Sequence, residues 1–412
     1  MTLKDTPMEE EHLRLTWQAP KNLIGLSFTN FLLRILTVGI YHFWAKTEVR
    51  QRIWSAIRIN GEPLIYTGRG IELLLGFLIV LLAVFLPFLL LTVGAVLVLG
   101  PNNPLVSFIT LPTYALFAYL IGIAIYRAQR YRLARTRWRG IRGSLEGSPA
   151  AYAWTYFWTL LLIPLTLGWI IPWRTTKLQG MITNNIRFGD RPLHFNARSG
   201  PLYGPFAVMW FGTLLIFFIF TSFLSALLGP FIQQSQQQHI PVQLQLGSEV
   251  VIALIASAVS AWLIYAIVSA WYQARTTNHF ANHTHFENAR FQGNLSALGL
   301  VWLSFSNFLI VLAGVLILTA LLIGLALSFI DTALLRIPEG RAITQALIGF
   351  APLLLLLGFT LFSPIVQART AGYIIQNMKI TGTVPVAEIA QSAGADLKYG
   401  EGLAEAFDVD AF

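Results

Sequence analysis

The chain has 412 residues, of which 55% are hydrophobic and only 11% are charged. A soluble globular domain carries roughly 25% charged residues, so this composition excludes an ordinary soluble protein. The absence of cysteine excludes disulfide bonds, thiol catalysis and cysteine-ligated metals. The formal net charge of +9 does not predict nucleic-acid binding, because Lys and Arg gather in the cytoplasmic loops of membrane proteins.

Long stretches without acidic or basic residues predict membrane-spanning helices. A helix needs about 20 apolar residues to cross roughly 30 Å of hydrocarbon, and continuous apolar runs do not fit the alternating strands of a membrane barrel. The sequence therefore predicts an all-α polytopic membrane protein. The uncharged stretches are 73–99, 105–125, 199–248, 250–274, 291–330 and 342–368.

Two shorter apolar segments, 23–44 and 151–173, contain helix breakers and share one pattern. Each holds Leu-Thr-x-Gly followed by four residues and a Trp. Corresponding residues of the two copies are separated by the same number of positions throughout. We interpret Gly and Pro as points where the helices break and Trp as an interfacial anchor, with substrate binding between broken helices as the alternative. The motif residues are Thr37, Gly39 and Trp44 in the first copy, and Thr166, Gly168, Pro172 and Trp173 in the second.

Arg34 lies inside the first of these segments. Charge within a membrane is costly, so such a residue is a hypothesis of function by default. The alternative is a segment that does not reach mid-bilayer, from which the guanidinium extends to the interface.

The stretch after each Trp predicts an interfacial helix and then a β-hairpin. Asn60-Gly61 and Gly189-Asp190 stand between alternating residues, which is a strong signal for two-residue turns. We predict β-ribbons at 57–67 and 186–196 on the cytoplasmic side, pairing with each other or with 379–386.

Residues 127–142 hold seven arginines with aromatic residues between them. This pattern predicts contact with anionic lipids, or else with an acidic protein segment such as the acidic tail of the same chain. The arginines assigned to this contact are Arg127, Arg130, Arg132, Arg135, Arg137 and Arg139.

His279, His283 and Glu287 follow at spacings of four, which would stack them along one face of a helix. Imidazole and carboxylate groups at that spacing could hold Zn²⁺, although no HExxH pattern is present. The alternative is a polar cytoplasmic loop. No other feature favours an enzyme, so we predict a non-enzymatic protein without a cofactor.

The similarity between the copies predicts internal repeats. Arg58 matches Arg187, and Pro63 matches Pro192, while a weaker third copy begins at Pro364. In this third copy the Trp is lost and the opening apolar segment is expanded into a helical pair. We predict three repeat units at 1–130, 131–275 and 276–390, followed by an acidic mobile tail at 391–412.

The pattern LTxGxxxxW, followed by a basic helix and an Asn-Gly-type turn, resembles the YjgN-like family of bacterial inner-membrane proteins. The copies read LTVGIYHFWAK and LTLGWIIPWRT, with Phe43 in place of the family's usual Pro and Trp169 in place of its Ile. Copies of the pattern extend over nearly the whole chain. The resemblance implies a multi-pass protein of the bacterial inner membrane and assigns no activity.

The positive charges predict the topology. Loops near 100–104 and 233–248 lack Lys and Arg and should face the periplasm, whereas the basic stretches 45–70, 127–150 and 174–202 should face the cytoplasm. Segments 23–44 and 151–173 would then be re-entrant or interfacial broken helices beside six spanning helices, with both termini cytoplasmic. The alternative is eight spanning helices, in which the charge rule fails at one loop.

Two hypotheses of function follow. The leading one is a membrane protein that binds or moves a small or lipid-like substrate through a repeat-built helical bundle. The alternative is a membrane scaffold that docks a protein partner through its basic cytoplasmic loops. The partners expected in either case are the bilayer and its anionic lipids, and no nucleic acid.

Overall fold

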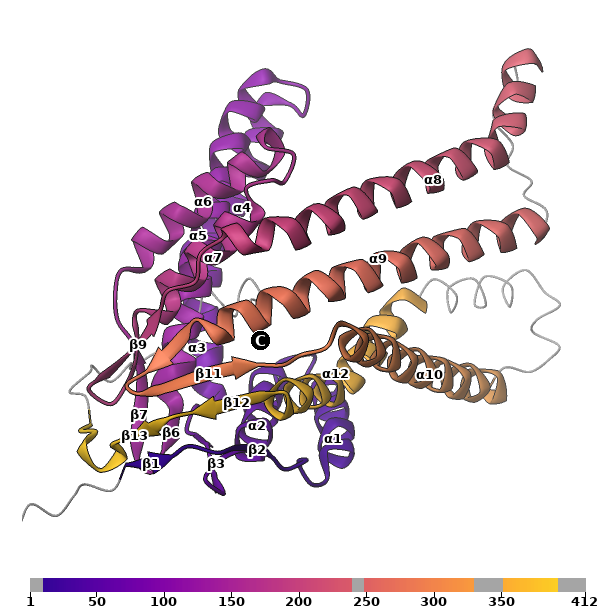
Figure 1. Cartoon of the computed structure of the whole chain (residues 1–412). Coiled ribbons are helices and arrows are strands. Elements are labelled where there is room, and N and C mark those ends of the chain that lie inside the picture. The colour runs from indigo at the N-terminus through magenta and orange to yellow at the C-terminus, as the bar shows by residue number, and fades with distance from the viewer. Residues whose placement is uncertain (1–9, 239–247, 330–350, 392–412) are drawn as a thin grey trace, which may run out of the picture.

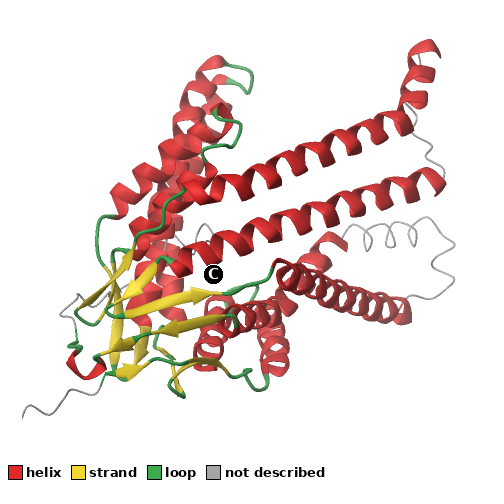
Figure 2. Cartoon of the chain, viewed as in Figure 1, coloured by secondary structure: helices red, strands yellow, loops and turns green. Residues whose placement is uncertain are grey.

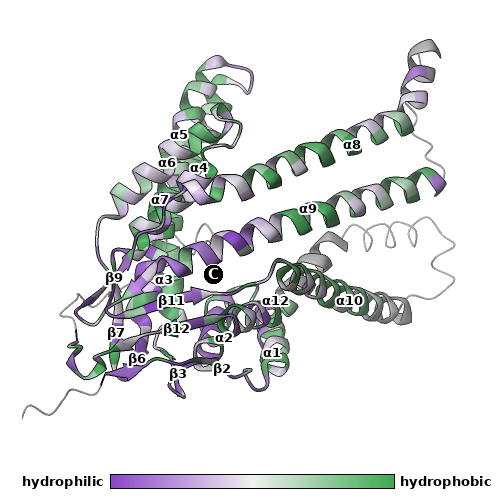
Figure 3. Cartoon of the chain, viewed as in Figure 1, coloured by the Kyte–Doolittle hydropathy of each residue, from purple (hydrophilic) through white to green (hydrophobic). Residues whose placement is uncertain are grey.

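A computed structural model describes residues 10–238, 248–329 and 351–391 of the chain. Long helices extend from a β-structure at one end of the molecule (Figures 1 and 2). Hydrophobic residues follow the long helices, whereas hydrophilic residues gather over the strands (Figure 3). The predicted tail lies almost entirely outside the described residues, as does part of the sixth apolar stretch.

Within the described residues, five helical segments are long and apolar enough to span a membrane, which confirms a polytopic helical membrane protein. They are Gly70–Leu99, Pro104–Arg135, Gly200–Pro230, Glu249–Asn282 and Ala297–Ala320. The helices are α1 (Leu23–Leu36), α2 (His42–Ala56), α3 (Gly70–Val80), η1 (Leu81–Phe85), α4 (Leu86–Leu99), α5 (Pro104–Arg135), α6 (Pro149–Leu165), α7 (Ile171–Thr183), α8 (Gly200–Gln238), α9 (Ser248–Asn282), α10 (Ala297–Phe329) and α12 (Ala351–Gln376).

The Leu-Thr-x-Gly pattern makes the same helix-ending turn in both copies. Gly39 and Gly168 have φ angles of 88° and 85°, and each amide donates to the carbonyl five residues earlier, at 2.8 and 2.7 Å. This is the longer hydrogen bond of a Schellman cap. The left-handed cap residues are Val38 and Leu167, at φ angles of 50° and 49°, and each glycine follows in a second positive-φ position. The turns reverse the chain between α1 and α2 and between α6 and α7.

The strands form a ring at the end of the helices. Three pairs of short strands are nearly continuous: Gly382 alone separates β12 from β13, Leu64 alone separates β4 from β5, and β1 continues into β2. Counting each pair as one strand, the thirteen described strands make a ring of ten antiparallel strands. β13 pairs with β1 and β2 pairs with β3, which closes the ring. The strands are β1 (Glu11–His12), β2 (Leu15–Trp17), β3 (Ile57–Ile59), β4 (Glu62–Pro63), β5 (Ile65–Tyr66), β6 (Thr136–Trp138), β7 (Ile141–Leu145), β8 (Ile186–Phe188), β9 (Arg191–Phe195), β10 (Thr284–Phe286), β11 (Ala289–Gly293), β12 (Met378–Thr381) and β13 (Thr383–Val384).

Both segments predicted as hairpins contain antiparallel strands joined by two-residue turns, with Ile59 opposite Glu62 and Phe188 opposite Arg191. Their predicted pairing was wrong. Hairpin β6–β7 lies between the two ribbons, hairpin β10–β11 between the second ribbon and β12, and β1 and β2 between β13 and the first ribbon, so neither ribbon pairs with the other or with residues 379–386. The β-structure is thus larger than an all-α description allows.

The two short helical pairs begin and end at neighbouring points of this ring. Trp17, before α1, pairs with Ile57, after α2; Leu145, before α6, pairs with Ile186, after α7. At 1.5 Å per residue, the 17 residues of α6 extend about 25 Å from the ring, short of a full hydrocarbon crossing.

Candidate functional site

The interior of the ring is an apolar lumen. Successive side chains along a strand point to opposite faces, and the inward set from nearly all strands packs into one cluster. A cavity of about 220 Å³ remains within this cluster. It is lined by Leu13, Leu15, Ile59, Leu64, Leu133, Thr136, Trp138, Gly143, Ile186, Arg187, Phe188, Leu193, Phe286, Phe291, Ile380, Val384, Val386 and Ile389.

Trp138 supplies an unusual feature of this lining. Its side chain is only 4% exposed, and its indole nitrogen is buried with no hydrogen-bond partner among the described residues. The Arg139 guanidinium lies 4.8 Å from the indole ring centroid. A buried indole N–H usually finds an acceptor, so Trp138 leaves an unsatisfied donor within the wall of the lumen, covered by its neighbours.

The C-terminal segment closes the end of the lumen that lies away from the helices. After β13 the chain forms η3 (Val386–Glu388), and Val386 and Ile389 enter the inner cluster. The Asp190 amide donates to the Ala390 carbonyl at 3.0 Å, and the Ala390 amide donates to Asp190 Oδ1 at 3.1 Å. These bonds hold the segment against the β8–β9 turn.

Ion pairs fasten the N-terminal strand beside the same end. Arg139 Nη1 lies 2.8 Å from Glu11 Oε1, and its Nε lies 3.0 Å from Glu62 Oε2. The hydrogen bond from Arg139 is the main cause that lowers the pKa of the Glu11 carboxyl below its ordinary value. Arg139 thereby joins β1, β4 and the β6–β7 turn.

Acid should loosen this fastening. Because the folded-state pKa of Glu11 is lowered, its contribution to stability is complete above the ordinary value near 4.5 and is lost as pH falls through the folded pKa. We expect faster hydrogen exchange in residues 10–17 below about pH 4, after correction for intrinsic rates. Arg139→Gln should remove this pH dependence, and an unchanged pH profile in that variant would contradict the assignment.

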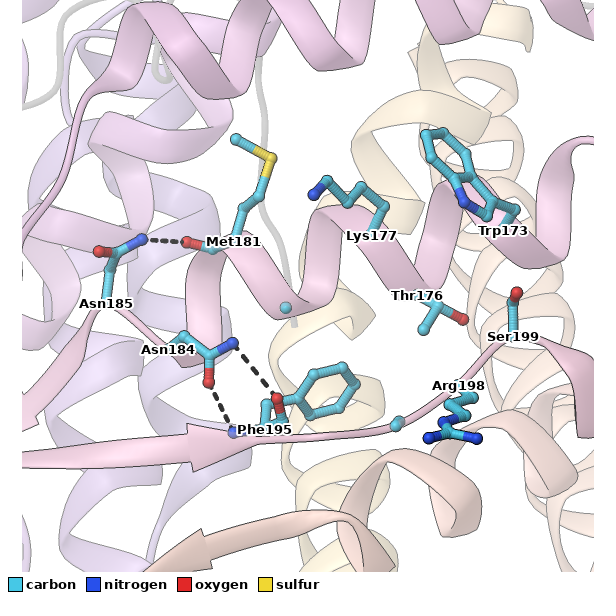
Figure 4. Close-up of a pocket in the computed structure, with 11 residues that line it drawn as sticks. Trp173, Thr176, Lys177, Met181, Asn184, Asn185, Phe195, Arg198 and Ser199 are labelled. Atoms are coloured by element: carbon cyan, nitrogen blue, oxygen red, sulfur yellow. Dashed lines mark hydrogen bonds between the residues drawn. The ribbon is translucent and has the colours of Figure 1, made fainter.

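A second, larger cavity lies outside the ring. It is an open groove of about 530 Å³ between α7 and residues 195–199, the connection from β9 to α8 (Figure 4). Asn184 fixes one end, accepting from the Phe195 amide at 2.6 Å and donating to its carbonyl at 3.2 Å. The lining residues are Trp173, Thr176, Lys177, Gly180, Met181, Asn184, Asn185, Phe195, Ala197, Arg198 and Ser199.

The structure places the motif residues in the two helix-reversing turns rather than in a shared pocket. Thr37 Oγ1 donates to the Leu33 carbonyl at 2.7 Å and accepts from the Tyr41 amide at 2.9 Å, and Thr166 makes the equivalent bonds. Arg34 lies in the last turn of α1. Trp44 stacks on Tyr41, Pro172 is buried at the start of α7, and Trp173 packs against Trp158 and lines the groove.

Apolar side chains are exposed at both turns. Val38 is 92% exposed and Leu167 is 69% exposed. The Leu167 carbonyl accepts a hydrogen bond of 2.7 Å from the Trp210 indole of α8. Exposed apolar side chains around satisfied backbone groups suit a turn that lies in lipid.

The predicted arginine surface is divided. Arg130 donates to the Leu145 and Gly147 carbonyls, Arg135 pairs with Glu72, and Arg139 pairs with Glu11 and Glu62. Arg132 is buried, at 6% exposure. Within the described chain, only Arg127 and Arg137 of the six are exposed and form no side-chain contact with a carboxylate or carbonyl group, because residues 127–142 form the end of α5 and the β6–β7 hairpin.

The predicted metal site at His279, His283 and Glu287 required one continuous helix through these residues. The structure has no such helix. α9 ends at Asn282, and Glu287 lies in the β10–β11 turn at a φ of 50°. His279 and His283 remain adjacent, with ring centroids 4.3 Å apart, but Glu287 lies near Arg191 instead, at 3.7 Å. No group of three His, Asp or Glu side chains within the described ranges could hold a metal ion.

Sequence reasoning missed the β6–β7 and β10–β11 hairpins and therefore the lumen. The missed signal is a basic residue two positions before each turn, in the first strand of every hairpin and in β12. Adjacent residues of these strands alternate between the outer and inner faces of the ring. The basic residues at this position are Arg58, Arg137, Arg187, His285 and Lys379.

Fold and site together define a polytopic helical membrane protein that carries an apolar β-ring at one end of its helices. The chain belongs to the family described as "Bacterial protein of unknown function (DUF898)", whose pattern matches residues 19–406. This match confirms the family resemblance found in the sequence.

Two curated relatives are similar to parts of the chain. "Inner membrane protein YjgN" of Escherichia coli O157:H7 is 28% identical over 160 residues, which cover 38% of this chain and 37% of the relative. The protein of the same name from Escherichia coli strain K12 is 30% identical over 142 residues, covering 34% and 32%. The chain thus spans about a third of the length of these relatives. No solved structure matches.

Proposed function

We propose that this chain is an integral protein of the bacterial inner membrane that binds the apolar part of a lipid-like molecule in the lumen of its β-ring. The observation that carries the proposal is an apolar cavity closed at the end away from the helices. The names of the two relatives support the location. The topology we propose keeps both termini and the ring on the cytoplasmic side, with α1–α2 and α6–α7 as re-entrant pairs and the three repeat units as predicted.

The size of the lumen limits its ligand. An apolar cavity of about 150 Å³ holds benzene, whereas drug-sized ligands occupy about 300–1,000 Å³. The cavity of about 220 Å³ therefore suits one short alkyl chain or small ring, and not a whole two-chain lipid.

The basic outer face of the ring supports the scaffold hypothesis as a second candidate. Arg137, Arg290 and Lys379 are exposed on strands whose opposite face is apolar. A cationic surface of this kind attracts an acidic protein segment. The lumen has no role in that function, so filling the lumen separates the two candidates.

Photolabelling tests the proposal. Full-length protein in vesicles is irradiated with a fatty-acid analogue that carries a photoreactive group in its chain, and labelled peptides are identified by mass spectrometry. We expect labelling within 133–145 and 286–291. Leu64→Trp fills the lumen and should reduce this labelling at least about tenfold. Thr381→Trp, at an exposed position of β12, is the control. Labelling confined to the spanning helices would contradict a lipid-binding lumen.

A further inference from the structure

The groove outside the ring has the charge of an anion-binding site. Lys177 projects from α7 and Arg198 from the connection to α8, and both are exposed (Figure 4). No acidic residue lines the groove, and neither cation forms a salt bridge in the described part of the chain. The side-chain amides are already engaged, since Asn184 bonds to Phe195 and Asn185 donates to the Met181 carbonyl at 2.6 Å. The two cations are therefore the charged groups that line the groove.

The groove lies beside the start of a candidate spanning helix. α8 begins at Gly200, and the candidate span also begins there, so Arg198 and Ser199 directly precede it and we place the groove near the membrane surface. Trp173 forms the other side of the same groove. Cations beside a Trp at the end of a spanning helix meet the headgroups of anionic lipids.

The first copy of the repeat provides an internal comparison. At the offset that aligns Trp44 with Trp173, Glu48 takes the place of Lys177, Gln51 that of Gly180 and Gly70 that of Ser199. A Cβ added to Gly70 would lie 2.8 Å from the Trp44 Cα, so the connection there packs directly against α2. The first copy thus lacks the space. Its equivalent positions hold Glu48, Arg52 in place of Met181 and Arg69 in place of Arg198, so their net charge is +1, against +2 in the second copy.

We infer that this groove of the second copy binds the phosphate headgroup of an anionic phospholipid. Lys177 would reach the phosphate from the α7 wall and Arg198 from the wall formed by residues 195–199, and Trp173 would border the start of the acyl chains. The shared chemistry is a phosphate ester beside two cations, and the position at the end of a span favours a lipid over a soluble phosphate. This site is separate from the lumen and does not depend on the function proposed for it.

A lipid-binding titration tests the inference. Full-length protein in neutral detergent is titrated with a tail-labelled phosphatidylglycerol. Each cation near an anionic headgroup contributes about a factor of five in affinity, so Lys177→Ala with Arg198→Ala should weaken binding about 25-fold. Lys177→Glu, which restores the residue of the first copy, should weaken it further. Arg69→Ala with Arg127→Ala removes two exposed cations elsewhere and should have little effect.

Two outcomes would overturn the inference. Equal weakening in the two double variants would mean that binding follows net charge and not this groove. Displacement of the labelled lipid by millimolar inorganic phosphate would assign the groove to a soluble ligand, whereas we expect no displacement. Monodispersity of the groove variants on size-exclusion chromatography reports folding, and photolabelling of the lumen tests the proposed function separately.

Discussion

Replacing Glu72 with alanine should destabilise the protein by about 2–3 kcal/mol. Glu72 lies in the first turn of α3 and accepts hydrogen bonds from the Tyr131 hydroxyl at 2.7 Å and from Arg135 at 2.9 Å, both near the end of α5. Its side chain is 16% exposed and that of Arg135 is 22% exposed. Breaking a buried ion pair costs about 3–5 kcal/mol, and partial exposure reduces that figure.

The control is Glu62→Ala, which removes a carboxylate that also pairs with an arginine but has 48% side-chain exposure. This variant should lose at most about 1 kcal/mol, because water replaces the lost partner. Heating the detergent-solubilised proteins and measuring the fraction that stays monodisperse compares the two. Glu72→Gln keeps an acceptor and should be intermediate. A similar loss for both alanine variants would show that Glu72 has no special role in joining α3 to α5.

Cysteine labelling should give an all-or-none result for the re-entrant pair. Glu146 and Asn196 are exposed residues on either side of α6 and α7, and the chain is free of native cysteine. We expect Glu146→Cys and Asn196→Cys to resist an impermeant thiol reagent in intact cells and to react after permeabilisation. The pairing of Leu145 with Ile186 holds the two ends of this segment together on one side of any membrane.

Asn102→Cys serves as the reference, since Asn102 is exposed in the loop between α4 and α5, at the opposite end of these helices from the ring. It should react in intact cells. Labelling of Asn196→Cys but not Glu146→Cys would rule out the re-entrant pair and support eight spanning helices. Labelling of both would place the ring in the periplasm and reverse the predicted orientation.

Local pattern determined the class of protein and several of its turns. Uncharged stretches of about 20 residues leave a helix as the structure that satisfies the backbone in lipid. Asn60-Gly61 and Gly189-Asp190 end in two-residue turns because these residues tolerate positive φ angles, as seen for Asn60, Gly61 and Gly189. Gly39 and Gly168 reverse the chain for the same reason. Each of these features depends on a few consecutive residues, so the sequence alone contains it.

Only the tertiary structure decided the ring and its lumen. Closure requires residue 384 to pair with residue 11, and nothing local to either segment specifies that contact. The ion pairs of the arginines could not be predicted from the sequence either. Arg139 and Glu11 are 128 positions apart, and only the ring brings Arg139 Nη1 within 2.8 Å of Glu11 Oε1. The spacing of four would place His279, His283 and Glu287 on one face only in a continuous helix. α9 ends at Asn282, where the chain joins the ring. Strand pairing between distant segments set these outcomes, because a hairpin gains most of its stability from the neighbours that cover it.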